Sequence, residues 1–333
     1  MNQQAPQDEP ETTSRRRFMS SICTSMSAGF AAGAFGSLGC STDKKGPQFK
    51  TDLVVGQRGL SEGRFQKPRA IAIDPSTQQL YVIDKTARIQ VFDADGTYLR
   101  GWETPMIEQG KPTGISIDLD GTILVADTHY FRFLFYTPNG ELLENKTIGG
   151  INGPDPGQFA FVTDIVRAKS GEYILGEYGE FDRIYKYSSD GKYITRFGES
   201  GEEPLQFRRP QSLAIDEQGL LWVADDCNHR IQVLDWRGDR PELVKIFGTE
   251  GSDAGQLKHP RSIALTPGHV IVSEYGNHRV QKFDRDGNSI AIWGSVGRGI
   301  GELIDPWAVA VDARERVYVV DSGNNRVQRF RFT

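Results

Sequence analysis

The chain has 333 residues and a formal net charge of −5, with 38% apolar side chains and 37 glycines. With glycine counted, the apolar share is that of an ordinary globular protein, so the chain can build a core. The acidic balance disfavours a dedicated nucleic-acid binder, which usually carries a strongly basic domain. The length would suit two average domains, but all-β rings of this size often form one.

Residues 1–39 have the composition of an export signal. A polar start leads to Ser14-Arg15-Arg16-Arg17-Phe18, which is followed by a weakly apolar run rich in Gly, Ala and Ser. This pattern resembles a twin-arginine signal, with Arg15 and Arg16 as the pair. A transmembrane anchor is the weaker alternative, because the run is short and poor in Leu, Ile and Val.

A cysteine after this leader is a candidate for lipidation. The run Ser37-Leu38-Gly39-Cys40 resembles a bacterial lipoprotein box, in which Cys40 becomes the lipidated first residue of the mature chain. The box usually has Leu where Ser37 stands, and a cleavage site after Ala34 competes with it. We expect residues 40–48 to form a polar tether that holds the remaining chain at a membrane through lipid alone. The expected location is therefore the periplasm or the cell envelope.

From residue 49 onward the chain repeats one phrase six times. Its clearest copy is EYGNHRVQKFDRDG from Glu274, in which an acid ends an apolar run, a polar turn follows, and an arginine opens an alternating strand. The six acids, spaced 43 to 50 residues apart, are Asp84, Asp127, Glu177, Asp225, Glu274 and Asp321. Self-similarity at this period indicates a repeat architecture.

Each repeat is interpreted as four short strands. In the fifth repeat, RSIALT, HVIVSE, RVQKFD and SIAIWG are separated by turn residues. A sheet this small and apolar on both faces is marginal alone, so we expect the repeats to stack radially. The last repeat ends after its third strand, at RFRFT. Since Gly56 and Pro68 have the same 12-residue spacing as Gly198 and Pro210, the strand near residues 53–55 is expected to complete the last blade and close the ring.

The repeats resemble NHL repeats, the modules of six-bladed propellers. The resemblance rests on Pro-x-x-(Ile/Val)-Ala-(Ile/Val)-Asp, Val-Ala-Asp and Asn-His-Arg elements and covers about residues 49–333. It implies an all-β, TolB-like six-bladed β-propeller with four antiparallel strands per blade, similar to exported bacterial NHL-repeat proteins. It does not imply one function, because this scaffold carries binding modules, lyases and hydrolases.

Groups that recur in every repeat are expected to be structural, since an active site is used once per ring. Each repeated acid is followed within six residues by an arginine, and we expect the two to fix the turn between the second and third strands. The same reasoning applies to His129, His229 and His278, which occupy that turn. We therefore predict no metal site and no resident cofactor.

Positions at which the repeats differ are the candidates for binding. The starts of the inner strands and the turns after the second strands should meet at one face of the ring and gather cations and aromatic rings there. The predicted binding residues are Arg69, Thr113, Thr163, Gln211, Arg261, Trp307, Tyr178 and Tyr275. In propellers that resemble peptidyl-hydroxyglycine amidating lyases, histidines after the inner-strand proline help to hold zinc, but none of these positions is His here. The calcium ligands of lactonase-like propellers are not matched either.

One inner strand departs furthest from the pattern. Asp164 stands where the other repeats have Ala, Gly or Ser, which makes it a weak candidate for a catalytic base or a ligand in the channel. We expect a binding scaffold that recognises an envelope protein or an anionic or sugar-like ligand, rather than an enzyme. The alternatives are a lyase or hydrolase that uses Asp164, Glu177 or Glu274 with an unrecognised metal, and RNA binding, which export and acidity oppose.

Overall fold

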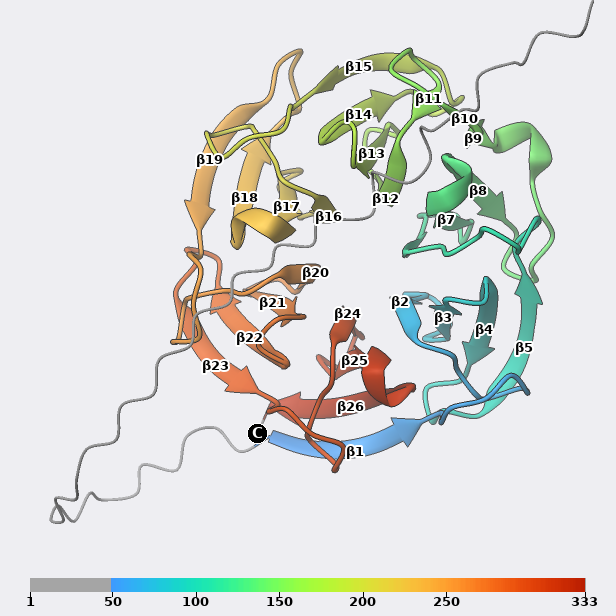
Figure 1. Ribbon diagram of the computed structural model, residues 1–333, viewed down its shortest axis with the longest axis vertical. Helices are drawn as coiled ribbons and strands as arrows, with labels where there is room; N and C mark the ends of the chain where they lie inside the picture. Colours follow the sequence, from blue (N-terminus) through green and yellow to red (C-terminus); the bar gives the residue numbers. More distant parts are fainter. Residues whose placement is uncertain (1–48, 333) are drawn as a thin grey trace, which may run out of the picture. The chain divides into compact units, whose positions relative to one another are not determined.

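Six four-stranded antiparallel sheets surround a common axis in the computed structural model, which describes residues 49–332 (Figure 1). The predicted six-bladed propeller is confirmed. The leader, with Arg15, Arg16 and Cys40, lies outside the described residues. Among the residues that are described, no helix has both the length and the apolar character needed to cross a membrane.

The first three blades follow one another along the chain. Blade 1 contains β2 (Pro68–Ile73), β3 (Leu80–Asp84), β4 (Arg88–Phe92) and β5 (Tyr98–Glu103). Blade 2 contains β6 (Gly114–Ile117), β7 (Ile123–Asp127), β8 (Arg132–Tyr136) and β9 (Ile148–Gly149). Blade 3 contains β12 (Phe161–Arg167), β13 (Tyr173–Tyr178), β14 (Arg183–Tyr187) and β15 (Tyr193–Phe197). A short parallel pair, β10 (Ile151–Asn152) and β11 (Gln158–Phe159), precedes blade 3.

The last three blades continue the order. Blade 4 contains β16 (Pro210–Ile215), β17 (Leu221–Asp225), β18 (Arg230–Asp235) and β19 (Glu242–Phe247). Blade 5 contains β20 (Pro260–Leu265), β21 (His269–Glu274), β22 (Arg279–Asp284) and β23 (Ser289–Trp293). Blade 6 contains β24 (Pro306–Val311), β25 (Val317–Asp321), β26 (Arg326–Phe332) and β1 (Phe49–Val55).

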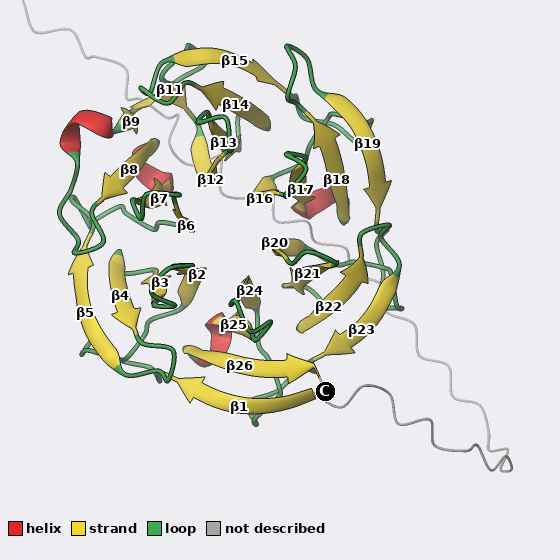
Figure 2. Ribbon diagram, turned by 180° about the vertical axis from the view of Figure 1, so that it is seen from behind, coloured by secondary structure: helices red, strands yellow, loops and turns green. Residues whose placement is uncertain are grey.

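Short 3-10 helices are the only helical elements among residues 49–332 (Figure 2). Three of them form the turns between the second and third strands of blades 2, 4 and 6: η1 (Thr128–Tyr130), η3 (Asp226–Asn228) and η4 (Ser322–Asn324). The fourth, η2 (Glu144–Lys146), precedes β9. The near-absence of helix follows from the period-2 alternation of the repeats.

The two ends of the propeller close the ring. Strand β1 pairs antiparallel with β26, with Phe49 opposite Phe332 and Val55 opposite Val327, and Figure 1 shows them side by side in blue and red. This confirms the closure expected from the 12-residue spacing. Pairing of the first strand with the last removes a free sheet edge at the seam.

The hydrophobic core is divided among the interfaces between neighbouring blades. One cluster joins blades 2 and 3 through Phe133, Phe135, Leu175 and Tyr185, and five others occupy the remaining interfaces within residues 49–332. Both faces of each sheet are therefore covered by a neighbour, as the apolar character of the strands requires.

Candidate functional site

The six repeated acids fix the loops that lead into the inner strands. Each carboxylate is fully buried, and a nitrogen of its arginine lies 2.5 to 2.9 Å from a carboxylate oxygen. In blade 5, Glu274 also accepts the backbone N–H of Lys258, while Arg279 donates to the Gln256 carbonyl. Because the pair recurs in every blade it is structural, as predicted. Glu177 and Glu274, the acids of the enzyme alternative, both belong to it.

The turn histidines are structural as well. The Nδ1 atoms of His229 and His278 accept the backbone N–H groups of His259 and Asp305, each from the next blade, at 3.1 Å. His129 packs against Phe161 in place of such a hydrogen bond. Burial lowers the pKa of His129 to about 4, with Lys111 and Arg69 adding to the effect, so its ring is neutral at physiological pH.

A bulge near the start of the inner strands presents one side chain per blade to the same end of the ring. In blade 1 the pairing register shifts between Pro68 and Ala70, so Arg69 has no opposite residue in β3. The same shift occurs in blades 4, 5 and 6 at Gln211, Arg261 and Trp307. A bulge breaks the alternation of a strand and redirects its side chain.

These side chains line a narrow cavity on the axis of the ring, here called the mouth. The mouth has a volume of about 30 Å³. Five predicted binding residues line it, together with Asp164: Arg69, Thr113, Gln211, Arg261 and Trp307. A cavity of this size admits a single functional group of a ligand, whose remainder would lie over the face of the ring.

Thr163 does not line the mouth, which corrects the prediction. Its side chain is fully buried, and its carbonyl accepts the hydroxyl of Thr113 at 3.3 Å. In blade 3 the register shift extends from Val162 to Ile165, so two residues share the bulge. Asp164, the second of them, lines the mouth, as Ser212 and Ser262 do at the same repeat position.

Two mouth arginines share aromatic neighbours. The guanidinium carbons of Arg69 and Arg261 lie 4.9 and 4.7 Å from the ring centre of Trp307, and Arg261 lies 4.7 Å from that of Tyr275. Burial lowers the pKa of Arg69, and repulsion from Arg261 and Arg209 lowers it further. Arg69 forms no ion pair with any residue in the range 49–332. Its guanidinium donates a hydrogen bond to the Lys111 carbonyl at 3.4 Å.

A third arginine belongs to the mouth, although it was not among the predicted binding residues. Arg209 lies 4.5 Å from the ring centre of Tyr178, which, like Tyr275, is a predicted binding residue that lies beside the mouth without lining it. Its Nε donates to the Gln211 side chain at 3.0 Å, and Arg261 donates to the same oxygen at 3.3 Å. Gln211 therefore fixes the spacing of the two cations.

One buried carboxylate offsets part of this charge. Asp226 is fully buried, and its Oδ2 lies 3.3 Å from Arg261 and 3.6 Å from Arg209. Burial raises the pKa of Asp226, but Arg261, His259 and Arg209 outweigh it and hold the pKa below its usual value. Arg69, Arg209 and Arg261 face Asp226 and Asp164, so guanidiniums outnumber carboxylates at the mouth. The sequence signal for Asp226 was its place after a repeated acid, where no other repeat has an acid.

Asp164 joins the inner strands of two blades. Its Oδ2 accepts the backbone N–H of Leu213 at 2.9 Å, and its Oδ1 accepts that of Ile165 at 3.0 Å. Ser212 and Ser262, at the same position of their repeats, likewise accept an N–H from the following blade. Burial raises the pKa of Asp164 to about 7 in spite of its hydrogen bonds. The contact is part of the ring and does not require a carboxylate.

A group of possible metal ligands lies beside the mouth. Ligand atoms of Asp226, Cys227 and His259 lie within 4.8 Å of one another, and His259 Nδ1 is 2.9 Å from Asp226 Oδ1. Sequence analysis missed this group because its members come from two blades. The guanidinium of Arg261, next to Asp226, opposes a further cation.

Comparison with known proteins agrees with the repeat interpretation. A family model described as NHL repeat matches residues 207–234, 257–283 and 303–330. NHL repeat-containing protein 3 of Mus musculus is 27% identical over 307 residues, which is 85% of this chain and 84% of that protein. Peptidyl-glycine alpha-amidating monooxygenase of Mus musculus is 26% identical over 312 residues, which is 86% of this chain but 28% of that protein.

Solved propellers share the architecture at low identity. A gluconolactonase from Xanthomonas campestris superposes with a TM-score of 0.62 at 14% identity, over 82% of this chain and 88% of its own. Virginiamycin B lyase from Staphylococcus aureus gives 0.59 at 14% identity, over 86% of this chain and all of its own, 100%. At such identities the likeness shows the fold alone.

Proposed function

Since the chain is an NHL-repeat β-propeller, we propose that it is an exported binding module whose mouth recognises an anionic group on an envelope ligand. The observation that carries this proposal is Arg69. This arginine lies at the axis beside two further guanidiniums, and it has no acidic partner within residues 49–332. An anion bound there would relieve the repulsion among the three cations.

The surroundings of Arg69 favour a carboxylate attached to a larger body. The mouth itself, at about 30 Å³, has room for one such group. The rings of Trp307, Tyr275 and Tyr178 beside it offer apolar faces for a sugar ring or a side chain. An acidic sugar or an acidic loop of a protein would meet both requirements.

Export and anchoring complete the proposal. The arginine pair Arg15-Arg16 is the signal for the twin-arginine route, and Cys40 is the site of lipidation. Substituting lysine for both arginines should retain the full chain in the cytoplasm of a bacterium that has this route. Cys40→Ala should move the exported protein from the membrane fraction to the soluble periplasm, and an unchanged distribution would contradict lipidation.

Binding is tested by titrating the full chain with trigalacturonate and with pentaglutamate. The trimethyl ester of trigalacturonate serves as the neutral counterpart of the sugar probe. Arg69→Gln should weaken binding of the charged probe by roughly tenfold or more, since each charge-assisted contact contributes about 1.5–3 kcal/mol. Arg298→Gln, an exposed arginine in the loop before blade 6, is the matched control. Equal affinity for acid and ester, or failure of both acids to bind, would contradict the proposal.

A metal-dependent reaction at the mouth is the second candidate function. The specific observation is the convergence of Asp226, Cys227 and His259, since a thiolate, an imidazole and a carboxylate together suit zinc. Metal analysis of the purified full chain decides it. One tightly held zinc, lost in His259→Ala, would favour the enzyme, whereas metal-free protein that still binds the acids would favour the binding module.

A further inference from the structure

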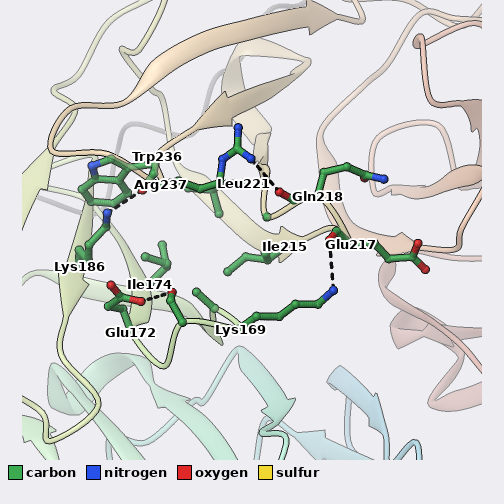
Figure 3. A pocket seen from close by; sticks show the side chains of 13 residues that line it. Lys169, Glu172, Ile174, Lys186, Ile215, Glu217, Gln218, Leu221, Trp236 and Arg237 are labelled. Atoms are coloured by element: carbon green, nitrogen blue, oxygen red, sulfur yellow. Dashed lines mark hydrogen bonds between the residues drawn. The ribbon is translucent and has the colours of Figure 1, made fainter.

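A second pocket lies between blades 3 and 4 (Figure 3). Its volume is about 360 Å³, within the range of small-molecule sites. It is lined by the turns that follow the inner strands, 168–172 and 217–219, and by the turn after β18. In a blade of this topology those turns lie at the end opposite the turns that form the mouth. The pocket is therefore separate from the mouth.

The pocket exists because blade 3 lacks two groups that other blades have. Where blades 1, 2, 4 and 6 end the inner strand with aspartate, blade 3 has Ala168. Where blades 1, 4 and 6 have Tyr or Trp in the second strand, it has Ile174. In blade 4 the corresponding Trp222 Nε1 donates to Asp216 Oδ2 at 2.9 Å, which fills the equivalent space. Ala168 and Ile174 are both walls of the pocket.

Blade 5 shares this departure in sequence. It has Thr266 and Ile271 at the two positions. There the guanidinium of Arg285 donates to the Thr266 carbonyl and also lies 5.3 Å from the ring centre of Trp222. Arg285 therefore lies in the interface between blades 4 and 5. The residue at its repeat position in blade 4 is Trp236, which lines the pocket.

A buried lysine stands at one end of the pocket. Lys186 in β14 is 8% exposed, and its Nζ donates to the carbonyls of Trp236 at 2.6 Å and Gly238 at 3.3 Å. It forms no ion pair with any residue from 49 to 332, unlike Arg329 at the same repeat position, which pairs with Asp52 at 2.8 Å. An ammonium has three N–H donors. Two carbonyls leave one N–H of Lys186 for a ligand.

Three other charged side chains around the pocket contact their own neighbours, and Glu217 adds a second carboxylate to the lining. Arg237 pairs with Asp235, Lys169 Nζ donates to the Glu217 carbonyl at 3.1 Å, and Glu172 accepts the hydroxyl of Ser170. Burial lowers the pKa of Lys186, while Glu172 and Asp239 act against that shift. Beside the apolar walls, Lys186 is thus a cation that no carboxylate within residues 49–332 pairs with.

Apolar side chains form the floor beside this cation. Ile174, Leu221 and Trp236 are buried, and Ile215 covers one side, as Figure 3 shows. The Trp236 ring centre lies 4.5 Å from Lys186 Nζ. The indole Nε1 of Trp236 has no hydrogen-bond partner among the described residues.

We propose that this pocket binds a small carboxylate with an aromatic or aliphatic body. The carboxylate accepts the free N–H of Lys186, and the body lies on Ile174, Leu221 and Trp236. This site is additional to the mouth and does not depend on it. A pocket of about 360 Å³ suits a ligand of the size of a phenyl- or indolyl-alkanoate.

The test uses phenylacetate, phenylacetamide and phenethylamine as probes of one shape and three charges. The full chain is titrated with each probe by calorimetry. We expect saturable one-to-one binding of phenylacetate, at least tenfold weaker binding of the amide, and none of the amine. Equal affinity for acid and amide, or no saturable binding of the acid, would overturn the proposal.

Variants locate the site. Lys186→Met should reduce phenylacetate affinity to that of the amide, whereas Lys282→Met, at the same position of blade 5, should leave it unchanged. Ala168→Asp restores the carboxylate of the other blades and should abolish binding of the acid, which keeps the test decisive if Lys186→Met fails to fold. Arg298→Gln, in an exposed loop, should have no effect. Loss of phenylacetate binding in Arg69→Gln but not in Ala168→Asp would assign the probe to the mouth and refute the pocket.

Discussion

Replacing Asp164 with asparagine should change the pH dependence of stability. The folded-state pKa of this carboxyl is raised to about 7 from an ordinary value of 3.8, because burial disfavours the charged form. A group whose pKa is raised on folding contributes its full stability below its unfolded-state pKa. This stability is lost as the pH rises through its folded-state pKa. At about 1.4 kcal/mol per pKa unit, ionisation of this group should lower the free energy of unfolding by about 3 kcal/mol as the pH rises from 5 to 9.

The assay is equilibrium denaturation of wild type and Asp164→Asn at pH 5, 7 and 9. Other buried acids also titrate in this range, Asp127 with a pKa raised to about 6 by burial among them, so the quantity to compare is the difference between the two proteins. Between pH 5 and pH 9, the free energy of unfolding of the asparagine variant should rise by about 3 kcal/mol relative to that of wild type. Asp95→Asn, in an exposed turn, is the control. A difference that stays constant with pH would refute the assignment of Asp164 as a buried, ring-joining carboxyl.

Three further outcomes follow from the fold. Glu274→Ala should lower the free energy of unfolding by about 3–5 kcal/mol, because it leaves the buried charge of Arg279 without its acidic partner; a loss no larger than that of the exposed Asp286→Ala, measured by denaturation, would contradict this. Deletion of residues 49–55 should expose the edge of β26 and cause concentration-dependent association in size-exclusion chromatography, whereas a monomeric, equally stable product would show that closure is dispensable. Arg261→Met should be more destabilising than Arg69→Gln by thermal denaturation, since only the former removes an ion-pair partner of the buried Asp226.

The architecture could be predicted from the sequence because each repeat carries the same local information. The acid and arginine of every repeat, exemplified by Glu274 and Arg279, fix a turn within one blade, so their role follows from recurrence alone. Ring closure could also be predicted, because the last repeat lacks a fourth strand and a single strand precedes the first repeat. Pairing these two ends of the propeller completes the last blade.

The candidate site was only partly predictable because it depends on contacts between blades. Thr163 was expected at the mouth, but its side chain is buried away from it, whereas Asp164 lines the mouth as the residues at its repeat position do. Arg209 and Asp226 come from different segments of blade 4, and only the fold brings them to Arg261 of blade 5. The pocket between blades 3 and 4 had one signal in the sequence, Ala168, which stands where most repeats have aspartate. Whether this change leaves a pocket depends on the side chains of the neighbouring blade, which the sequence alone does not place.

The most direct measurement of mouth recognition is the ratio of affinities of wild type and Arg69→Gln for an acidic probe, taken at low and high salt. Arg69 is the mouth cation without an acidic partner within residues 49–332, so its removal should weaken binding by roughly tenfold at low salt and by less at high salt, where screening reduces the electrostatic share. Equal affinities for the two proteins at both salt concentrations would show that the mouth is not where this propeller recognises anions.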